Sequence, residues 1–196
     1  MKKYGFFGGS FNPPTIAHER LAEDIADKFK LDKVYFVPVG NYYEKTDLID
    51  ENKRFDMLKS IKTDKIDVLD IELNSKKKLL AVDAFELINN SFSSSENYFI
   101  IGGDNLEKLP NWENATKCLN NNIIAIQRGK NLASIIAENK LLEENKNKIF
   151  EFNANKLYNY SSTEVRKAIK NGNMETLNKM LNKNVYFYIE ENNLYK

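Results

Sequence analysis

The chain has 196 residues, 42% of them hydrophobic, and its 29 basic and 28 acidic side chains leave a formal net charge of +1. This balance argues against binding to nucleic acid through bulk charge, and the length suits one domain, which we expect to span residues 1–196. The single cysteine, Cys118, excludes an internal disulfide, and the absence of a signal peptide or of a long apolar run predicts a cytoplasmic protein without a membrane partner.

Apolar runs and amphipathic segments alternate along the chain. We expect strands at residues 2–7, 33–39, 65–73, 97–103, 122–129 and 148–152, and helices at 15–29, 51–61, 81–92, 132–146, 161–172, 174–181 and 184–195. This alternation predicts an α/β fold, a Rossmann-like parallel sheet with helices on both faces and a small helical C-terminal part. In such folds ligands bind beyond the carboxyl ends of the strands.

The stretch GGSFNPPTIAH, residues 8–18, follows the first expected strand and contains the only histidine of the chain. Its glycines allow the backbone to approach a phosphate closely, and the following helix start offers free N–H groups. Thr15 and His18 lie three residues apart, so they share a face of the first helical turn and can donate hydrogen bonds to a phosphate. The alternative is an ordinary turn followed by an ordinary helical histidine.

A second candidate anion site is SSTEVR, residues 161–166. Ser161, Ser162 and Thr163 stand at the start of an expected helix, where hydroxyls and free N–H groups bind phosphate oxygens. Arg166 lies one turn further on and can add a bidentate, charge-assisted contact. The alternative is that a serine only caps the helix and that Arg166 is a surface charge.

These two stretches together resemble a known family. GSFNPPTIAH resembles the [HT]xGH-type signature of the adenylyltransferase branch of the nucleotidyltransferase superfamily, and YSSTEVRKAI resembles its ISSTxIR-type signature. Within that superfamily the chain resembles the nicotinate and nicotinamide mononucleotide adenylyltransferases. FVPVGNYYEKTDLIDENKRFDMLKSI, FIIGGDNLEKLPNWENA and NVYFYIEENNLY extend the resemblance over nearly the whole length.

The resemblance implies a reaction in which a pyridine mononucleotide attacks the α-phosphorus of ATP and pyrophosphate leaves. The implied ATP-binding residues are Gly8, Gly9, Ser10, Phe11, His18, Gly103, Asp104, Ser162, Thr163 and Arg166. Among these His18 and Arg166, with Thr15, would stabilise the charge that develops on the phosphates. Lys45 would bind the mononucleotide phosphate, and Trp112 would stack on the pyridine ring. The resemblance also implies Mg²⁺, held mainly by the ATP phosphates and not by dedicated metal ligands of the chain.

Two positions depart from the family pattern. Ala17 stands where the family usually has glycine, and Ala84 stands where it often has a threonine that contacts the pyridine substituent. The second departure leaves the preference between nicotinate and nicotinamide mononucleotide open, although the closing segment favours nicotinate. The association of copies of the chain into a homo-oligomer is also open.

Two other functions compete with this interpretation. A sister enzyme with the same ATP site, such as a phosphopantetheine adenylyltransferase or a cytidylyltransferase, would share both signatures, but Trp112 in the GGDNL…W segment argues against it. A nucleotide sensor without turnover is the second alternative. The retained Thr15, His18 and Arg166 argue against that one, since a sensor does not need groups that stabilise a transition state.

Overall fold

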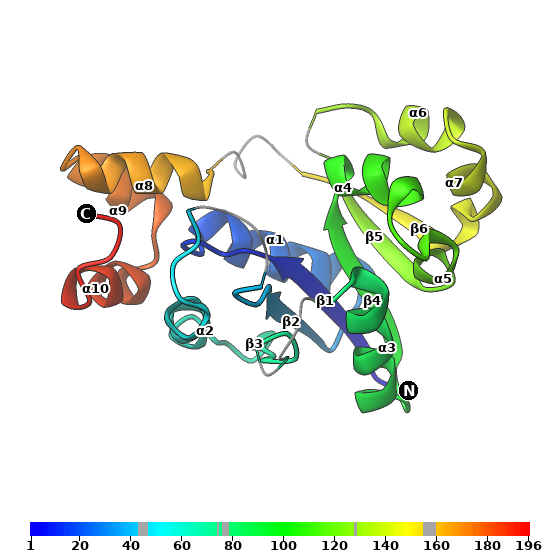
Figure 1. The fold of residues 1–196 in the computed structure, drawn as a ribbon, viewed down its shortest axis with the longest axis horizontal. Coiled ribbons are helices and arrows are strands. Elements are labelled where there is room, and N and C mark those ends of the chain that lie inside the picture. The colour runs from blue at the N-terminus through cyan, green and yellow to red at the C-terminus, as the bar shows by residue number, and fades with distance from the viewer. Residues whose placement is uncertain (43–46, 74, 76–78, 128, 155–159) are drawn as a thin grey trace.

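The computed structural model describes residues 1–42, 47–73, 75, 79–127, 129–154 and 160–196. Its centre is a six-stranded sheet in the order β3-β2-β1-β4-β5-β6, in which every neighbouring pair is parallel (Figure 1). The strands are β1 (Lys3–Gly9), β2 (Lys33–Pro38), β3 (Ile66–Val68), β4 (Glu96–Gly102), β5 (Asn122–Gln127) and β6 (Ile149–Asn153). The predicted parallel sheet is therefore confirmed.

Helices cover both faces of this sheet, as predicted. They are α1 (Ile16–Phe29), α2 (Glu51–Lys59), α3 (Ala81–Ser91), α4 (Gly103–Lys108), α5 (Ala115–Leu119), α6 (Leu132–Ala137), α7 (Lys140–Glu144), α8 (Ser162–Lys170), α9 (Met174–Met180) and α10 (Lys183–Glu191), with short 3₁₀ helices η1 (Leu109–Asn111) and η2 (Lys146–Lys148). Successive side chains of a strand point to opposite faces, so Phe7 packs with α1, α2 and α8–α10, whereas Phe6 packs with α3–α7. The sheet thus separates two apolar cores.

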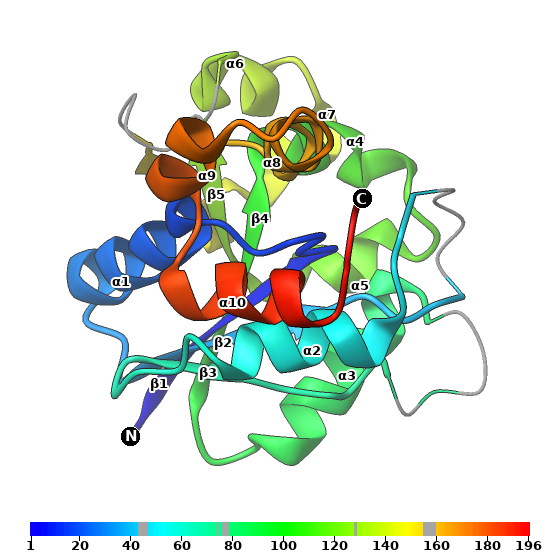
Figure 2. The ribbon, with the colours of Figure 1, turned by 90° about the vertical axis from the view of Figure 1, so that its left-hand side faces the viewer.

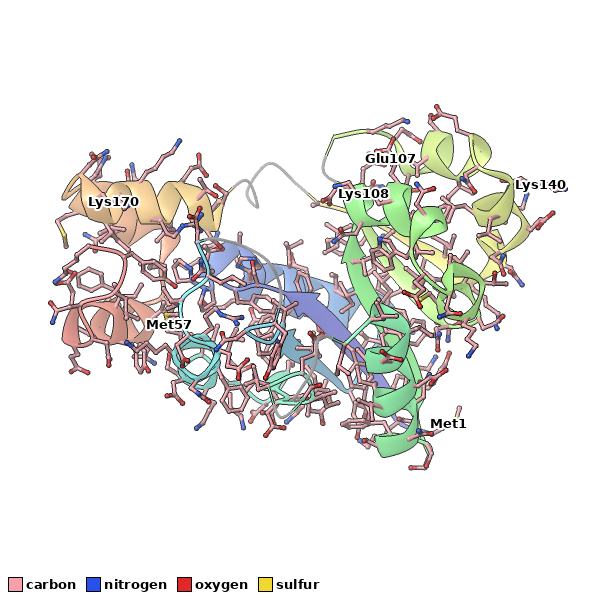
Figure 3. All side chains as sticks on the ribbon, in the orientation of Figure 1. Met1, Met57, Glu107, Lys108, Lys140 and Lys170 are labelled. Atoms are coloured by element: carbon pink, nitrogen blue, oxygen red, sulfur yellow. The ribbon has the colours of Figure 1, made fainter. Side chains whose placement is uncertain are left out.

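Apolar side chains fill these two cores, and charged side chains lie mostly on the outer surface. Met57 of α2 is completely buried, while the charged side chains of Lys140 on α7 and Lys170 on α8 lie on the outer surface (Figure 3). This division follows the amphipathic pattern of the sequence. Within the part of the chain that the structure describes, no helix is long and apolar enough to cross a membrane.

The segment 132–146, which we expected to be one helix, is two helices. Helix α6 ends at Ala137, and Asn139 then caps α7, because its side-chain oxygen accepts hydrogen bonds from the backbone N–H groups of Leu141 (3.0 Å) and Leu142 (3.3 Å). Asparagine is among the best N-cap residues, and its local bonds compete with a continuous helix. The expectation overlooked this cap within an apolar periodic segment.

The expected third strand and the last expected helix are both shorter than predicted. Strand β3 stops at Val68, since Leu73 donates to the carbonyl of Asp70 (3.0 Å) in a turn. Helix α10 stops at Glu191, and Asn193 (φ 49°) then adopts the left-handed conformation that ends helices. In both cases the apolar pattern continued past the point where the backbone turns.

The region between β4 and β5 contains helices that the sequence analysis did not assign. Leu106, Leu109, Trp112, Ala115 and Cys118 recur at intervals of three residues, and all but Trp112 are buried. This spacing is the helical signal that could have identified α4, η1 and α5. Together these three elements place Trp112 beside the carboxyl end of β4.

The helical C-terminal part packs on α1 and α2 (Figures 1 and 2). Asn182, which caps α10, donates to Glu19 of α1 (2.8 Å), and Tyr188 donates to Asp56 of α2 (3.3 Å). These contacts bring the α8–α10 segment back to the helices that follow β1 and β2, so the C-terminal helices share one face of the sheet with α1 and α2.

Candidate functional site

The two central strands, β1 and β4, lie where the order of the sheet reverses. The chain continues from β1 to β2 and β3 on one side, and from β4 to β5 and β6 on the other. The connections therefore diverge at the carboxyl ends of β1 and β4, which is where ligands bind in open α/β sheets. Gly8 is exposed at this edge, and no heavy atom lies within 4 Å of the place where a Cβ atom on it would stand.

His18 is held by the residue that caps its helix. The backbone N–H of Thr15 donates to Nδ1 of His18 (3.0 Å), and the Thr15 hydroxyl lies 2.9 Å from the same nitrogen. Because a backbone N–H can only donate, Nδ1 is an acceptor, and the ring proton is assigned to Nε2. Thr15 is fully buried, so its hydroxyl acts on the imidazole and does not face the solvent.

Phe11 supports the imidazole from its other side. Its ring is 2% exposed and meets the His18 ring edge to face, with 5.2 Å between centroids. The Phe11 backbone has φ 45°, which turns the chain sharply after Ser10. A Cβ atom at Gly9 would come within 3.0 Å of the Phe11 ring, so this close approach requires glycine.

The start of α8 touches the loop between β1 and α1 directly. Ser162 donates through its hydroxyl to the carbonyl of Pro13 (2.8 Å), and Nη1 of Arg166 donates to the carbonyl of Asn12 (2.8 Å). Nη2 of Arg166 lies 3.4 Å from the Thr163 hydroxyl. The structure therefore brings together the two stretches that the sequence singled out, although they are about 150 residues apart.

The structure shows which serine caps α8 and whether Arg166 is a surface charge. Ser161 is the cap, because its hydroxyl accepts from the N–H of Glu164 (3.2 Å) and Glu164 bonds back to the Ser161 backbone (2.9 Å). The Arg166 side chain is only 22% exposed, and its Nη2 lies 3.9 Å from the carboxylate of Asp47. Arg166 is thus not a solvated surface charge.

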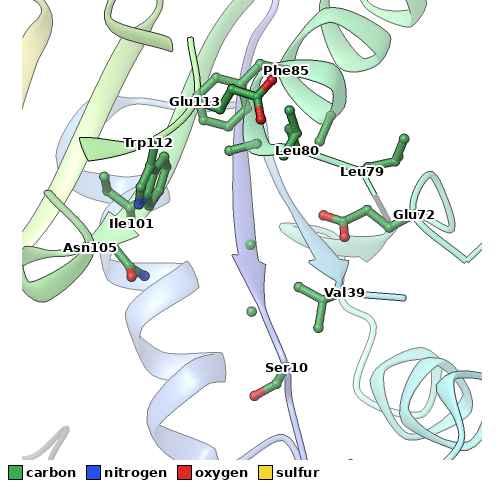
Figure 4. A pocket seen from close by; sticks show the side chains of 14 residues that line it. Ser10, Val39, Glu72, Leu79, Leu80, Phe85, Ile101, Asn105, Trp112 and Glu113 are labelled. Atoms are coloured by element: carbon green, nitrogen blue, oxygen red, sulfur yellow. The ribbon is translucent and has the colours of Figure 1, made fainter. Parts of the chain in front are cut away.

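A pocket of about 350 Å³ opens beside the glycine turn. Figure 4 shows Trp112, Ile101 and Asn105 on one side and Glu72, Leu79 and Leu80 on the other. The full lining is Gly8, Gly9, Ser10, Val39, Glu72, Leu79, Leu80, Ala81, Ala84, Phe85, Ile101, Asn105, Trp112 and Glu113. The pocket joins the glycine turn to Trp112 and Ala84, the two positions that the resemblance associates with the pyridine ring.

Glu72 is a pocket residue that the sequence analysis missed. Burial raises the pKa of its carboxyl group to about 7, although the backbone N–H of Gly40 and the positive charge of Arg54 both act to lower it. A Cβ atom on Gly40 would lie 2.9 Å from the carbonyl oxygen of Glu72, so the two segments pack closely. The pocket wall thus carries a carboxyl group that changes charge near neutral pH.

Arg54 is a second residue that the site depends on and that the predicted set left out. Its side chain is fully buried and donates to three backbone carbonyls, those of Ser10 (3.0 Å), Val39 (2.6 Å) and Ile49 (3.1 Å). Burial lowers the pKa of the guanidinium group. Arg54 therefore joins the loop after β1, the end of β2 and the segment before α2.

Gly103 and Asp104, which the resemblance assigns to ATP binding, do not line this pocket. Gly103 is buried as the first residue of α4, where a Cβ atom would lie 3.0 Å from Leu132, and Asp104 is exposed in the first turn of the same helix. Both stand at the carboxyl end of β4, but Asn105 is the residue of this turn that lines the pocket. Lys45 lies outside the described residues.

The described residues include no group of three or more histidine, cysteine, aspartate and glutamate side chains that could hold a metal ion. Magnesium is commonly bound through substrate phosphates and water, with few protein ligands. The side chains around the glycine turn instead provide hydrogen-bond donors, from His18 and Arg166. This donor set suits phosphate oxygens.

Comparisons with known proteins agree with this geometry. The sequence profile of the cytidylyltransferase-like family matches residues 6–168. A protein of Acholeplasma laidlawii named "Probable nicotinate-nucleotide adenylyltransferase" is 34% identical over 191 residues, which cover 97% of this chain and 96% of the relative. A Clostridium novyi protein of the same name is 30% identical over the full length of both chains.

A solved structure shows the same fold. The nicotinic acid mononucleotide adenylyltransferase of Plasmodium falciparum, solved in complex with NaAD, superposes with a TM-score of 0.81 at 24% identity, covering 100% of this chain and 98% of the other. At this identity the likeness concerns the arrangement of the elements.

Proposed function

The chain belongs to the cytidylyltransferase-like family and, within it, to the nicotinate-nucleotide adenylyltransferases, and from this membership we infer its reaction. It transfers the adenylyl group of ATP to nicotinate mononucleotide, giving the dinucleotide and pyrophosphate in NAD biosynthesis. One structural observation supports this most directly: the pocket with Trp112 in its wall is lined by Gly8–Ser10, and the start of α8 contacts Asn12 and Pro13 of the same loop. Residues 12–13 and 162–166 contribute to one site, which supports a single domain over residues 1–196.

We propose that the donors around the glycine turn act on ATP. A phosphate monoester is already an anionic nucleophile, so the chemistry needs mainly in-line positioning and neutralisation of charge. The N–H groups of Gly9 and Ser10 lie at the turn, and His18 adds the Nε2–H donor that its bond to Thr15 fixes. These groups would stabilise the charge that develops around the α-phosphorus.

The start of α8 would bind the far end of the triphosphate. Ser162 and Arg166 already donate side-chain hydrogen bonds to the backbone carbonyls of Pro13 and Asn12. The remaining N–H donors of the guanidinium group and the hydroxyl of Thr163, an exposed residue, would bind the β- and γ-phosphates. Magnesium would enter with ATP as part of the substrate complex, held by phosphate oxygens and water.

The pocket would hold the pyridine ring of the acceptor. Trp112 is partly buried and lines it, so an indole face is available for stacking on a cationic ring. Ala84 lines the same pocket and is 6% exposed, so it offers a methyl group where a hydroxyl would stand in many relatives. The phosphate contact assigned to Lys45 stays a prediction.

The decisive experiment is a product assay. The chain is incubated with ATP, Mg²⁺ and nicotinate mononucleotide, nicotinamide mononucleotide or phosphopantetheine, and with CTP in place of ATP. We expect dinucleotide formation with a pyridine mononucleotide and ATP. Turnover only with phosphopantetheine as the acceptor, or only with CTP in place of ATP, would point to a sister enzyme. ATP binding without any product would point to a sensor.

A further inference from the structure

Asn12, in the loop between β1 and α1, forms hydrogen bonds with several other segments of the chain. It is 3% exposed, its backbone carbonyl accepts from Arg166 (2.8 Å), and its side-chain Nδ2 donates to the carbonyl of Asp47 (2.6 Å). Its Oδ1 accepts from the hydroxyl of Tyr195 (2.9 Å) and from the backbone N–H of Ile49 (3.4 Å). Three segments far apart in the sequence therefore meet on one buried asparagine.

These partners fix the direction of every bond. A backbone carbonyl can only accept and a backbone N–H can only donate, so Nδ2 must face Asp47 and Oδ1 must face Ile49. The Tyr195 hydroxyl, which also faces Oδ1, must then donate its proton to Asn12. The side-chain amide of Asn12 cannot turn over without breaking two bonds to the backbone.

Tyr195 is held in place after α10 by its own segment. Leu194 is 5% exposed and donates to the carbonyl of Ile189 (3.0 Å), while Tyr195 itself has φ 65°. This left-handed conformation is unfavourable for a residue that carries a Cβ atom. Figure 2 shows the chain after α10 running toward α8, which carries Arg166. The segment thus maintains an unfavourable backbone conformation while its hydroxyl bonds Asn12.

We propose that Tyr195 is a positioning residue for the triphosphate end of the ATP site. By donating to Asn12 it holds the loop carbonyl on which Nη1 of Arg166 rests, and so sets where the guanidinium group stands. Tyr195 acts through Asn12 and need not contact the nucleotide. This inference rests on the proposed function, in which Arg166 binds ATP.

The test compares two tyrosines of the C-terminal segment. Tyr195→Phe removes the hydroxyl that bonds Asn12, whereas Tyr188→Phe removes a hydroxyl that bonds Asp56 and does not touch the loop. Loss of one neutral hydrogen bond predicts a KM for ATP about threefold to tenfold higher in Tyr195→Phe, with the KM for the mononucleotide unchanged. Tyr188→Phe should leave both KM values unchanged, while thermal unfolding measures any loss of stability in each variant.

A double-mutant cycle distinguishes positioning from a general loss of stability. If Tyr195 acts through Arg166, Tyr195→Phe should have little further effect on ATP affinity in an Arg166→Lys background. Equal KM values for ATP in Tyr195→Phe and Tyr188→Phe, or additive effects in the cycle, would overturn the proposal. Titration with ATP alone gives a second readout, so a chain that binds ATP but forms no dinucleotide would refute the proposed function and still test Tyr195.

Discussion

Thr15 orients the imidazole of His18 as a hydrogen-bond donor. The backbone N–H of Thr15 occupies Nδ1, so in the proposed reaction the ring would offer its proton from Nε2 to charge that develops on phosphate. We expect His18→Ala to lower kcat by about 100-fold to 1,000-fold while the Kd for ATP changes little, as measured by pyrophosphate release and by ATP titration.

Thr15 provides the matched comparison for this prediction. Thr15→Ser keeps the hydroxyl beside Nδ1 and should retain most of the turnover, whereas Thr15→Val loses it and should fall between the wild type and His18→Ala. Turnover that is unaffected by His18→Ala would mean that the imidazole has no part in the reaction.

We expect Glu72 to make the choice of acceptor depend on pH. Its carboxyl group, with a pKa raised to about 7 by burial, is neutral at pH 6 and charged at pH 8. Charged Glu72 repels the carboxylate of nicotinate but not the neutral amide of nicotinamide. We therefore expect the ratio of kcat/KM for nicotinate over nicotinamide mononucleotide to fall roughly threefold to tenfold across this range.

The groups around Glu72 define the control. Gly40 and Arg54 stabilise its charged form, and Glu113 is a second carboxylate in the lining of the same pocket. Glu72→Gln removes only the titrating charge, so its ratio of the two kcat/KM values should stay flat from pH 6 to pH 8. A ratio that falls equally in both proteins would assign the pH dependence to another group.

Among the elements, α2 contributes to the site through Arg54, whose side chain is fully buried. Arg54 donates to the carbonyls of Ser10, Val39 and Ile49, so it joins the loop after β1, the end of β2 and the segment before α2. Lysine has a single donor group and cannot span three carbonyls. We expect Arg54→Lys to lower the free energy of unfolding by about 3 kcal/mol or more, measured by urea denaturation.

Arg20 offers the matched control for Arg54. It lies exposed on α1, so Arg20→Lys should leave the free energy of unfolding within about 0.5 kcal/mol of the wild type. If Arg54→Lys were as stable as Arg20→Lys, the three carbonyl bonds would not hold these segments together.

At the same scale, the sequence determined the elements better than their contacts. The alternation of apolar runs and amphipathic segments was sufficient for the parallel sheet, because each period reflects a local geometry. The break at Asn139 and the roles of Arg54 and Glu72 were not predicted from the sequence. The cap at Asn139 depends on a choice among competing local hydrogen bonds. The buried guanidinium and carboxyl groups depend on partners that are distant in the sequence. A fixed spacing along the chain does not reveal such partners.

At the scale of the whole molecule, the C-terminal helices contact α1. Asn182 at the start of α10 donates to Oε2 of Glu19 (2.8 Å), while the buried Oε1 of Glu19 has no hydrogen-bond partner among the residues that the structure describes. An unpaired buried carboxylate oxygen is unfavourable when the group is charged, and burial accordingly raises the pKa of Glu19. The interface is therefore more stable when this carboxyl group carries a proton.

The sign of the resulting pH dependence follows from linkage. In the unfolded chain Glu19 has an ordinary pKa, so the stability that it contributes is fully present below that value and is lost as the pH rises through the raised folded value. Glu19→Gln imitates the protonated side chain and keeps an oxygen for Asn182. We expect urea denaturation to show Glu19→Gln equal to the wild type near pH 4 and more stable than it near pH 7.5. A stability difference that does not grow with pH would show that Glu19 does not titrate on folding, and that the contact between α10 and α1 holds a charged carboxylate without penalty.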